Sequence, residues 1–279
     1  MSFSSPESSP ESSVPGTALV TGASSGIGAT YAARLARRGH DLILVARDQR
    51  PLEDLAATLR SETGVKVEVL RADLAARADL APVERRLRED AAITTLINNA
   101  GVSVPGRLLG ADPDRLEAMI QLNTIAVTRL AVAAADAFAA QGRGLIVNIA
   151  SVLALAPELF NGSYSGTKAY VLNLSQALND EVAEHGVRIQ AVLPGATRTE
   201  IFRKVGLDLD QMPQEMLMDL DEMVDAALAG LDQGELVTIP SLPDVGDWEA
   251  FTAARVKLGP NLSRNRAADR YKNGHGVVT

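Results

Sequence analysis

The stretch Thr21-Gly22-Ala23-Ser24-Ser25-Gly26-Ile27-Gly28 decides the fold expected for this chain of 279 residues. It follows a short apolar run and leads into a helical pattern. Glycines at such a turn allow a tight bend and a close approach to a pyrophosphate, whose charge the N-terminus of the next helix attracts. The GxxxGxG spacing alone would also fit a plain structural turn. Its position predicts a nucleotide-binding turn whose contacts are made by Gly22, Ser24, Ser25, Gly26, Ile27 and Gly28.

Outward from this turn, short apolar runs alternate with helical patterns, which is typical of βαβ units. The predicted strands are Ala18–Thr21, Leu42–Ala46, Val65–Arg71, Thr95–Asn98, Leu145–Ala150, Val187–Leu193 and Glu235–Ile239. The predicted helices are Ala29–Arg38, Pro51–Glu62, Ala78–Asp90, Pro113–Gln141, Tyr164–Glu184 and Gln214–Leu231. The expected fold class is α/β, a Rossmann-type, doubly wound parallel sheet of seven strands with helices on both faces.

The termini differ in composition from the rest of the chain. Residues 1–16 are mostly Ser, Pro and Glu, so we expect a disordered tail, and they lack the basic and apolar regions of a signal peptide. Residues 17–279 are predicted to form one Rossmann-type domain with a C-terminal extension from about 241. The alanine-rich run Ile125–Ala140 is interrupted by Arg129 and Asp136, so we expect a close-packed helix that does not cross a membrane.

Charge and cysteine content exclude several classes of protein. The net charge is −8, with 27 Lys plus Arg against 35 Asp plus Glu, which argues against nucleic acid or anionic membranes as partners. The chain has no cysteine, which removes disulfides and thiolate metal sites and favours a cytoplasmic location. The three histidines have no metal-ligand spacing, so no metal is expected.

The end of the second strand bears on the choice of cofactor. Dinucleotide-binding folds often place a carboxylate there for the 2′-hydroxyl of NAD, or an arginine for the 2′-phosphate of NADP. Here Ala46 ends the strand and Arg47 follows, with Arg50 nearby. NADP(H) is therefore favoured, while Asp48 keeps NAD(H) open as the less favoured cofactor.

A tyrosine and a lysine point to proton transfer. Tyr164 and Lys168 stand at i and i+4 near the start of a predicted helix, so they share one face. A neighbouring ammonium favours the phenolate of a tyrosine, whose ordinary pKa of ~10 is too high for a base at neutral pH. Ser151 ends the fifth predicted strand, where it could also act as a strand cap. A YxxxK pair occurs by chance in many helices, so the assignment of Tyr164 and Lys168 to proton transfer depends on the other motifs.

Taken together, the motifs resemble those of the short-chain dehydrogenase/reductase family. Beyond the glycine turn and YxxxK, the matches are Asp73-Leu74, Asn98-Asn99-Ala100-Gly101, Asn123, Ser151 and Pro194-Gly195-Ala196-Thr197-Arg198-Thr199. The resemblance covers about Thr17–Ile239 and implies strand order 3-2-1-4-5-6-7. It also implies that Ser151 binds a substrate carbonyl, Tyr164 transfers the proton, Lys168 binds the nicotinamide ribose, and Asn123 positions a water. Taken alone, Asn123 could equally be a buried helix amide.

The same resemblance implies further cofactor contacts. These are Asp73 and Leu74 at the adenine, Asn99, Ala100 and Gly101 at the adenine ribose, and Pro194, Gly195, Thr197 and Thr199 at the carboxamide and phosphates. Tyr164 and Lys168 would complete this set.

The sequence also suggests a substrate and an assembly. Expected substrate walls are apolar, which suits a hydrophobic carbonyl compound or alcohol, although such residues could equally be core: Leu153, Leu155, Leu159, Phe160, Ile201, Phe202, Met212 and Met216. Alanines in Pro113–Gln141 exceed the needs of a sheet-facing side and predict a homodimer or homotetramer, an intramolecular core helix being the alternative. A non-catalytic NADP(H)-binding redox sensor is the alternative function.

Overall fold

The structure, a computed structural model, describes residues 15–198 and 213–272. The chain divides into two units, residues 1–241 and 242–279. Most of the predicted disordered tail lies outside the described residues, and so do Thr199, Ile201, Phe202 and Met212 of the predicted site.

The first unit is built on a parallel sheet of seven strands. The order is β3-β2-β1-β4-β5-β6-β7, which confirms the predicted Rossmann-type fold and its strand order. The strands are β1 Thr17–Thr21, β2 Leu42–Ala46, β3 Val67–Arg71, β4 Ile93–Asn98, β5 Gly144–Ile149, β6 Val187–Val192 and β7 Val237–Thr238. The connection from β3 to β4 crosses over to the other side of β1, so β1 pairs with both β2 and β4. In folds of this kind, ligands bind where the strand order reverses, at the carboxyl ends of the strands.

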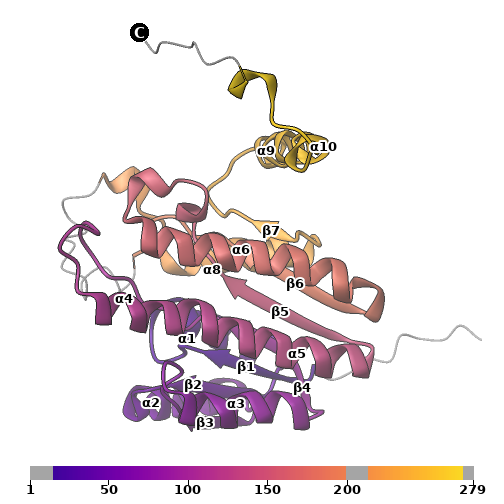
Figure 1. The fold of residues 1–279 in the computed structure, drawn as a ribbon. Coiled ribbons are helices and arrows are strands. Elements are labelled where there is room, and N and C mark those ends of the chain that lie inside the picture. Colours follow the sequence, from indigo (N-terminus) through magenta and orange to yellow (C-terminus); the bar gives the residue numbers. More distant parts are fainter. Residues whose placement is uncertain (1–14, 199–212, 273–279) are drawn as a thin grey trace, which may run out of the picture. The chain divides into compact units, whose positions relative to one another are not determined.

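Helices cover both faces of the sheet (Figure 1). Their bounds are α1 Gly26–Arg37, α2 Gln49–Thr63, α3 Arg77–Glu89, α4 Pro113–Ile120, α5 Val127–Gln141, α6 Gly162–Val182 and α8 Leu220–Asp232. One core joins α1, α2 and α8 to the sheet, and a second core joins α3, α5 and α6 to its opposite face. Strand residues alternate between these cores, as Leu42 and Leu44 face the first while Ile43 and Val45 face the second.

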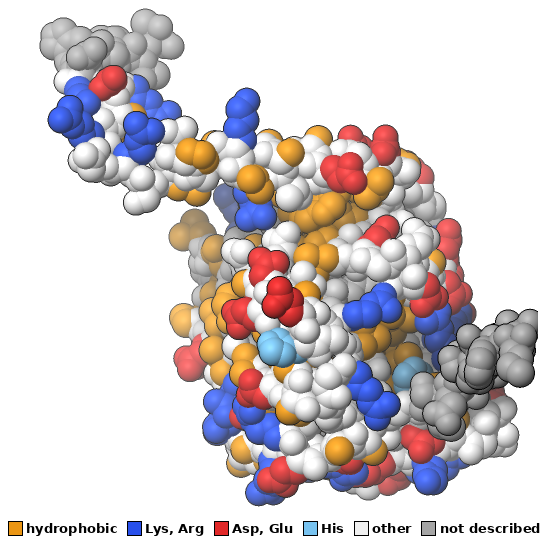
Figure 2. Space-filling view, turned by 90° about the vertical axis from the view of Figure 1, so that its right-hand side faces the viewer, with side chains coloured by type: hydrophobic (Ala, Val, Ile, Leu, Met, Phe, Trp, Pro, Cys, Tyr) orange, Lys and Arg blue, Asp and Glu red, His pale blue; other side chains and the backbone are white. Residues whose placement is uncertain are grey.

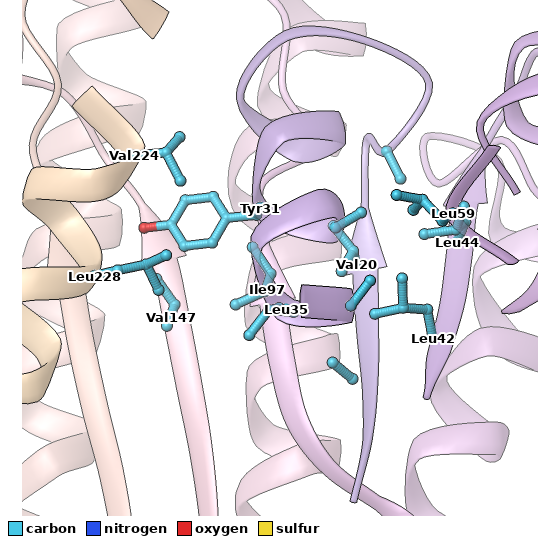
Figure 3. Close-up of a cluster of buried hydrophobic side chains, with 14 of the residues drawn as sticks. Val20, Tyr31, Leu35, Leu42, Leu44, Leu59, Ile97, Val147, Val224 and Leu228 are labelled. Atoms are coloured by element: carbon cyan, nitrogen blue, oxygen red, sulfur yellow. The ribbon is translucent and has the colours of Figure 1, made fainter. Parts of the chain in front are cut away.

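Figure 3 shows how the first core is filled between α1 and α8. The Tyr31 ring of α1 is fully buried and points toward Val224 and Leu228 of α8, beside Val147 of β5. At the surface above them, Arg34 binds Asp225 with two hydrogen bonds of 2.6 and 3.0 Å. Apolar packing therefore holds α8 on α1, while the exposed ion pair adds little because water screens it.

Two predicted helices differ in the structure. One is divided, where a capping side chain sets the start of its second part, and the other changes its helix type along its length. The predicted helix Gln214–Leu231 is a 3₁₀ turn over Gln214–Met216 followed by α8. The Asp219 carboxylate accepts hydrogen bonds from the Asp221 and Glu222 amides, so it caps α8 and sets its start. The predicted helix Pro113–Gln141 is continuous, but a π-helical segment, η1 Gln121–Ala126, separates α4 from α5.

The alanines of this long helix have a use that weakens the argument for an interface. Most of them are buried in the second core of the unit itself: Ala126, Ala131, Ala133, Ala134 and Ala135. The expectation that they exceed intramolecular needs was therefore wrong.

By length and composition alone, Pro113–Gln141 could cross a membrane, although 56% of its most apolar stretch is buried within the structure. That burial, together with its place on the sheet, is typical of a core helix.

The second unit is small and forms no core in its described part. It contains α9 Val245–Lys257, α10 Gly259–Leu262 and a 3₁₀ turn over Asp269–Tyr271, and none of its described side chains is buried.

Charges on the visible face of the first unit are mixed in sign. Figure 2 shows Lys and Arg interspersed with Asp and Glu there. That face presents no continuous basic surface of the kind that binds nucleic acid.

Candidate active site

The glycine turn between β1 and α1 is held by the end of β4. Gly22 and Gly26 adopt positive φ angles of 65° and 56°, which other L-residues rarely adopt. The Asn99 Nδ2 donates hydrogen bonds to the carbonyls of Thr21 at 2.9 Å and Gly22 at 3.3 Å. A Cβ on Gly22 would lie 2.7 Å from that nitrogen, and one on Gly28 would collide with the Gly22 carbonyl. The turn therefore needs glycine at both positions.

The first turn of α1 is open to an anion. Ser25 is the N-cap residue, and in the described chain its hydroxyl makes no capping hydrogen bond. The first amides of a helix need acceptors, and the helix dipole favours a negative one. Ser24 and Ser25 immediately precede Gly26, the first residue of α1. A cradle that an added Cβ would fill and a helix without its own cap fit the pyrophosphate of a dinucleotide.

The predicted adenine side follows β2 and β3. Arg47 is exposed immediately after Ala46, the last residue of β2. The Asp73 Oδ1 accepts a hydrogen bond from the Ala75 amide at 3.1 Å, so it shapes the turn after β3. Leu74 is buried in the second core, where its side chain packs on the sheet. These positions lie at the carboxyl edge of the sheet, on the same edge as the glycine turn.

The proton-transfer pair lies on the first two turns of α6. Tyr164 is partly buried, and the Phe160 ring meets its ring edge-on, with centroids 5.5 Å apart. Lys168 is buried, and its Nζ lies 5.8 Å from the Tyr164 ring centroid. This Nζ donates a hydrogen bond of 2.9 Å to the carbonyl of Ile149, the last residue of β5. The structure thus joins the lysine of α6 to the sheet edge just before Ser151.

Burial shifts the pKa values of both groups. It raises the pKa of the Tyr164 hydroxyl to about 12, so the tyrosine holds its proton at neutral pH. It lowers the pKa of the Lys168 ammonium to about 8, since the protein interior disfavours the charged form. The first shift suits a proton donor, and the second leaves the lysine mostly protonated at pH 7.

Asn123 lies on the π-helical segment and faces the same place. Its Oδ1 accepts from the Val102 amide at 2.9 Å, and its Nδ2 donates to the Val102 carbonyl at 2.8 Å and to Thr167 Oγ1 at 3.2 Å. A Cβ on Gly101 would lie 3.3 Å from Asn123 Oδ1 and 3.6 Å from Lys168 Nζ. Gly101 therefore lies beside Asn123 and Lys168. π-Helical segments are frequent at functional sites.

Ser151 and the segment after β6 complete the edge. Ser151 is buried, and its Oγ accepts a hydrogen bond from the Leu153 amide at 3.2 Å. The neighbouring Val152 amide donates to the Pro194 carbonyl at 3.0 Å, which places the two segments side by side. Thr197 is buried, and its hydroxyl donates to the Gly195 carbonyl at 3.2 Å. Within residues 15–198 and 213–272, no three or more His, Asp or Glu side chains are grouped in a way that suits a metal ion.

Sequence reasoning missed two side chains at this site. Asn161 caps α6, with its Oδ1 accepting from the Tyr164 amide at 2.9 Å. Thr167 Oγ1 donates to the Tyr164 carbonyl at 2.7 Å. A signal for Asn161 was available, because asparagine is a preferred N-cap residue, and it stands three positions before Tyr164. That cap places the start of α6 at Gly162, two residues before the predicted Tyr164.

Solved structures of similar chains share this fold. A short-chain dehydrogenase from Sphingobium yanoikuyae in complex with NADPH is 55% identical, with a TM-score of 0.89, and covers 92% of this chain and 99% of its own. A bulky-bulky ketone specific alcohol dehydrogenase from Comamonas testosteroni is 49% identical, with a TM-score of 0.86, and covers 93% and 99% of the two chains. Both similarities extend well beyond the motifs into the whole first unit.

Curated relatives are more distant. A very-long-chain 3-oxoacyl-CoA reductase from Podospora anserina is 34% identical over 181 residues, which is 63% of this chain and 53% of the relative. The matched part therefore spans about half the length of that reductase. The sequence pattern of the family described as short chain dehydrogenase matches residues 16–210. With this match, the strand order and the similar structures, the chain belongs to the short-chain dehydrogenase/reductase family of oxidoreductases.

Proposed function

We propose that the protein is an NADP(H)-dependent oxidoreductase that interconverts a bulky, apolar carbonyl compound and its alcohol. The observation that carries this proposal is the buried ammonium of Lys168 beneath the Tyr164 ring, at the sheet edge that also holds the glycine turn. Among the described residues no carboxylate forms an ion pair with Lys168. Burial of such an ammonium costs free energy, so a functional reason is needed for its retention.

In the reduction direction, Tyr164 acts as the acid and Ser151 holds the substrate. The bound NADPH supplies a hydride to the carbonyl carbon. The Tyr164 hydroxyl donates its proton to the carbonyl oxygen, so that the C=O double bond becomes a CH–OH group. The Ser151 hydroxyl donates a hydrogen bond to the same oxygen and orients it. In the oxidation direction, Tyr164 takes the proton back from the alcohol.

Lys168 and Asn123 support this proton transfer. The Lys168 ammonium stabilises the phenolate that Tyr164 becomes after donation, and it binds the hydroxyls of the nicotinamide ribose. Asn123 holds the segment after β4 in place through both bonds to Val102 and positions a water that leads from Lys168 to the solvent. The glycine turn would bind the pyrophosphate, and the remaining predicted contacts that the structure describes, from Asp73 to Thr197, would enclose the two ends of the dinucleotide.

The choice of NADP(H) rests on the end of β2. Arg47 is exposed there with no carboxylate at Ala46, so its guanidinium is available to a 2′-phosphate. The dehydrogenase from S. yanoikuyae, at 55% identity, was solved with NADPH. We expect NADPH to bind at least about tenfold more tightly than NADH, a difference of ~1.4 kcal/mol.

Titration of the two cofactors into wild-type protein and Arg47→Ala tests this preference. The variant should bind both cofactors equally. Arg143→Ala is the matched control, because Arg143 is exposed just before β5 at the opposite edge of the sheet. Equal affinities in the wild type would overturn the choice of cofactor.

The substrate class follows from apolar side chains just before α6 and just before α4 that the core does not use. Leu159 is 69% exposed and Leu109 is 89% exposed, although large apolar residues usually pack. Leu108 lies beside Gly162, at the start of the helix that carries Tyr164. The relative from C. testosteroni is a bulky-bulky ketone specific enzyme, which supports a ketone with two large substituents.

A screen of aldehydes, ketones, quinones and secondary alcohols tests the function. Absorbance of reduced nicotinamide should fall with NADPH and apolar ketones, and it should rise with NADP⁺ and the matching alcohols. A protein that binds NADPH and turns over none of these compounds would instead be a redox sensor, the second candidate function. Retention of Ser151, Tyr164 and Lys168 at one edge favours the enzyme.

A further inference from the structure

The peptide groups on both sides of Tyr164 are held by the side chains of the N-cap residue Asn161 and of Thr167, one turn further along α6. The Tyr164 amide donates to Asn161 Oδ1 at 2.9 Å. The Tyr164 carbonyl accepts from Thr167 Oγ1 at 2.7 Å, and Thr167 Oγ1 in turn accepts from Asn123 Nδ2 at 3.2 Å. The backbone that presents the Tyr164 hydroxyl is thus fixed from two directions.

The Asn161 amide does more than cap the helix. Capping uses only the Oδ1 acceptor, which Ser or Asp would supply equally well. The Nδ2 of Asn161 also donates to the carbonyls of Val104 at 2.5 Å and Gly106 at 3.3 Å. Asn161 is 9% exposed and Val104 is 7% exposed, so the bond to Val104 is shielded from water, whereas Gly106 is exposed. One side chain therefore links α6 to the segment that follows β4.

Asn123 holds the other end of the same segment. It makes both backbone hydrogen bonds of Val102, two residues before Val104. The two asparagines thus fix Val102, Val104 and Gly106 between the π-helical segment and the start of α6. Beyond Gly106 the chain continues to the exposed Leu108 and Leu109. Asn161 consequently anchors the base of an apolar segment as well as the turn that carries Tyr164.

We propose that Asn161 is a positioning residue, whose amide aligns Tyr164 for proton transfer by tying the N-cap of α6 to the Val104–Gly106 backbone. This inference rests on the proposed function, since it concerns the same proton transfer. Proton transfer requires contact at hydrogen-bond distance, and a displacement of about 1 Å can cost roughly 100-fold in rate. A helix cap without the two donor bonds leaves the helix intact and the tyrosine free to shift.

The decisive variant is Asn161→Ser, which keeps a capping oxygen and removes both donors. Asn161→Ala removes the cap as well, and Asn173→Ser is the matched control, because Asn173 is exposed on the same helix. We expect Asn161→Ser to keep the wild-type NADPH affinity while kcat with an apolar ketone falls about tenfold or more. Its Tm should lie above that of Asn161→Ala, because the cap remains, and below the wild-type value, because the buried Val104 carbonyl loses its donor. The deuterium isotope effect on kcat with labelled NADPH should rise, because the chemical step becomes slower than product release.

The outcomes separate this inference from the proposed function. If serine restores kcat along with Tm relative to Asn161→Ala, capping alone matters and the inference is wrong. If Asn161→Ser does not fold, Asn161→Asp gives the same comparison, since it keeps the shape and the capping acceptor but cannot donate. If wild-type protein binds no NADPH or reduces no ketone, the proposed function fails and this inference fails with it. The inference is supported if a donor-deficient variant recovers Tm relative to Asn161→Ala while its kcat stays low.

Discussion

At Lys168, burial creates a free-energy cost that makes stability depend on pH. The pKa of this ammonium is about 8 in the folded chain and an ordinary 10.5 when unfolded. Between these values the unfolded chain holds a proton that the folded chain has released, so stability rises with pH. Cofactor-free protein should therefore gain about 2 kcal/mol of unfolding free energy from pH 8 to pH 10, by this linkage alone.

Chemical denaturation of wild-type protein and Lys168→Met at these two pH values measures the effect. The methionine variant should be more stable at pH 8 and show a smaller rise toward pH 10. Measurements stay at or below pH 10 because the raised pKa of Tyr164, about 12, reverses the sign above that range. Identical pH dependence in the two proteins would show that Lys168 is not a desolvated ammonium.

Residue identities at the site were more predictable than their contacts. YxxxK spacing predicted that Tyr164 and Lys168 share a helix face, because helix geometry is local. The bonds from Asn161 to Val104 and Gly106 join positions 57 and 55 residues apart, and no local pattern encodes such a distance. The cofactor contact predicted for Asn99 stays a prediction. Its side-chain amide also ties the end of β4 to the glycine turn, and this bond could not be predicted without the register of β1 against β4.

At the scale of elements, the strands were predicted well because each is a short apolar run bounded by polar or glycine residues. Boundaries were less accurate where a cap decides them, as at Asn161 before α6 and Asp219 before α8. The π-helical segment Gln121–Ala126 was not predicted, since its residues fit an ordinary helix. Asn123 within it makes tertiary hydrogen bonds to Val102, which sequence periodicity does not report.

The β1–α1 turn and α6 give opposite expectations for a glycine-to-alanine change. A Cβ on Gly28 would collide with the Gly22 carbonyl, whereas one on Gly166 meets nothing within 4 Å. Gly28→Ala should lower the unfolding free energy by at least about 2 kcal/mol and weaken NADPH binding. Gly166→Ala should raise it by roughly 0.5–1 kcal/mol, because alanine favours helix. Denaturation curves for both variants check the pair, and a neutral Gly28→Ala would contradict the close packing of the turn.

At the scale of the whole molecule, a homo-oligomer is proposed through α5 and α6, which lie side by side on one face (Figure 1). The alanines no longer support this proposal, but exposed apolar side chains do. Ile125 and Val132 share a helix face with Thr128, whose hydroxyl lies 2.7 Å from the Tyr170 hydroxyl of α6. Their exposures are 44%, 38% and 42% for Ile125, Val132 and Tyr170. Such a patch suits a two-fold interface between identical helices.

Light scattering at micromolar concentration tests this assembly. Wild-type protein should exceed the monomer mass of 29.4 kDa, and Val132→Glu should reduce the mass of the species. Ala57→Glu is the control, because Ala57 is exposed on α2 on the opposite side of the sheet. Ala133 is unsuitable as a probe since it is buried in the unit itself. A wild-type mass of 29.4 kDa would refute the proposed assembly. The cytoplasmic location is a separate proposal, which cell fractionation tests.

The measurement that tests the central claim most directly is turnover by Tyr164→Phe. Phenylalanine keeps the ring and its contact with Phe160 and removes only the hydroxyl that donates the proton. The account predicts that the variant binds NADPH with wild-type affinity and reduces an apolar ketone at least about 1,000-fold more slowly, since the loss of a positioned acid typically costs 10²–10⁴-fold. Turnover by Tyr164→Phe at the wild-type rate would contradict the assignment of Tyr164 as the proton donor.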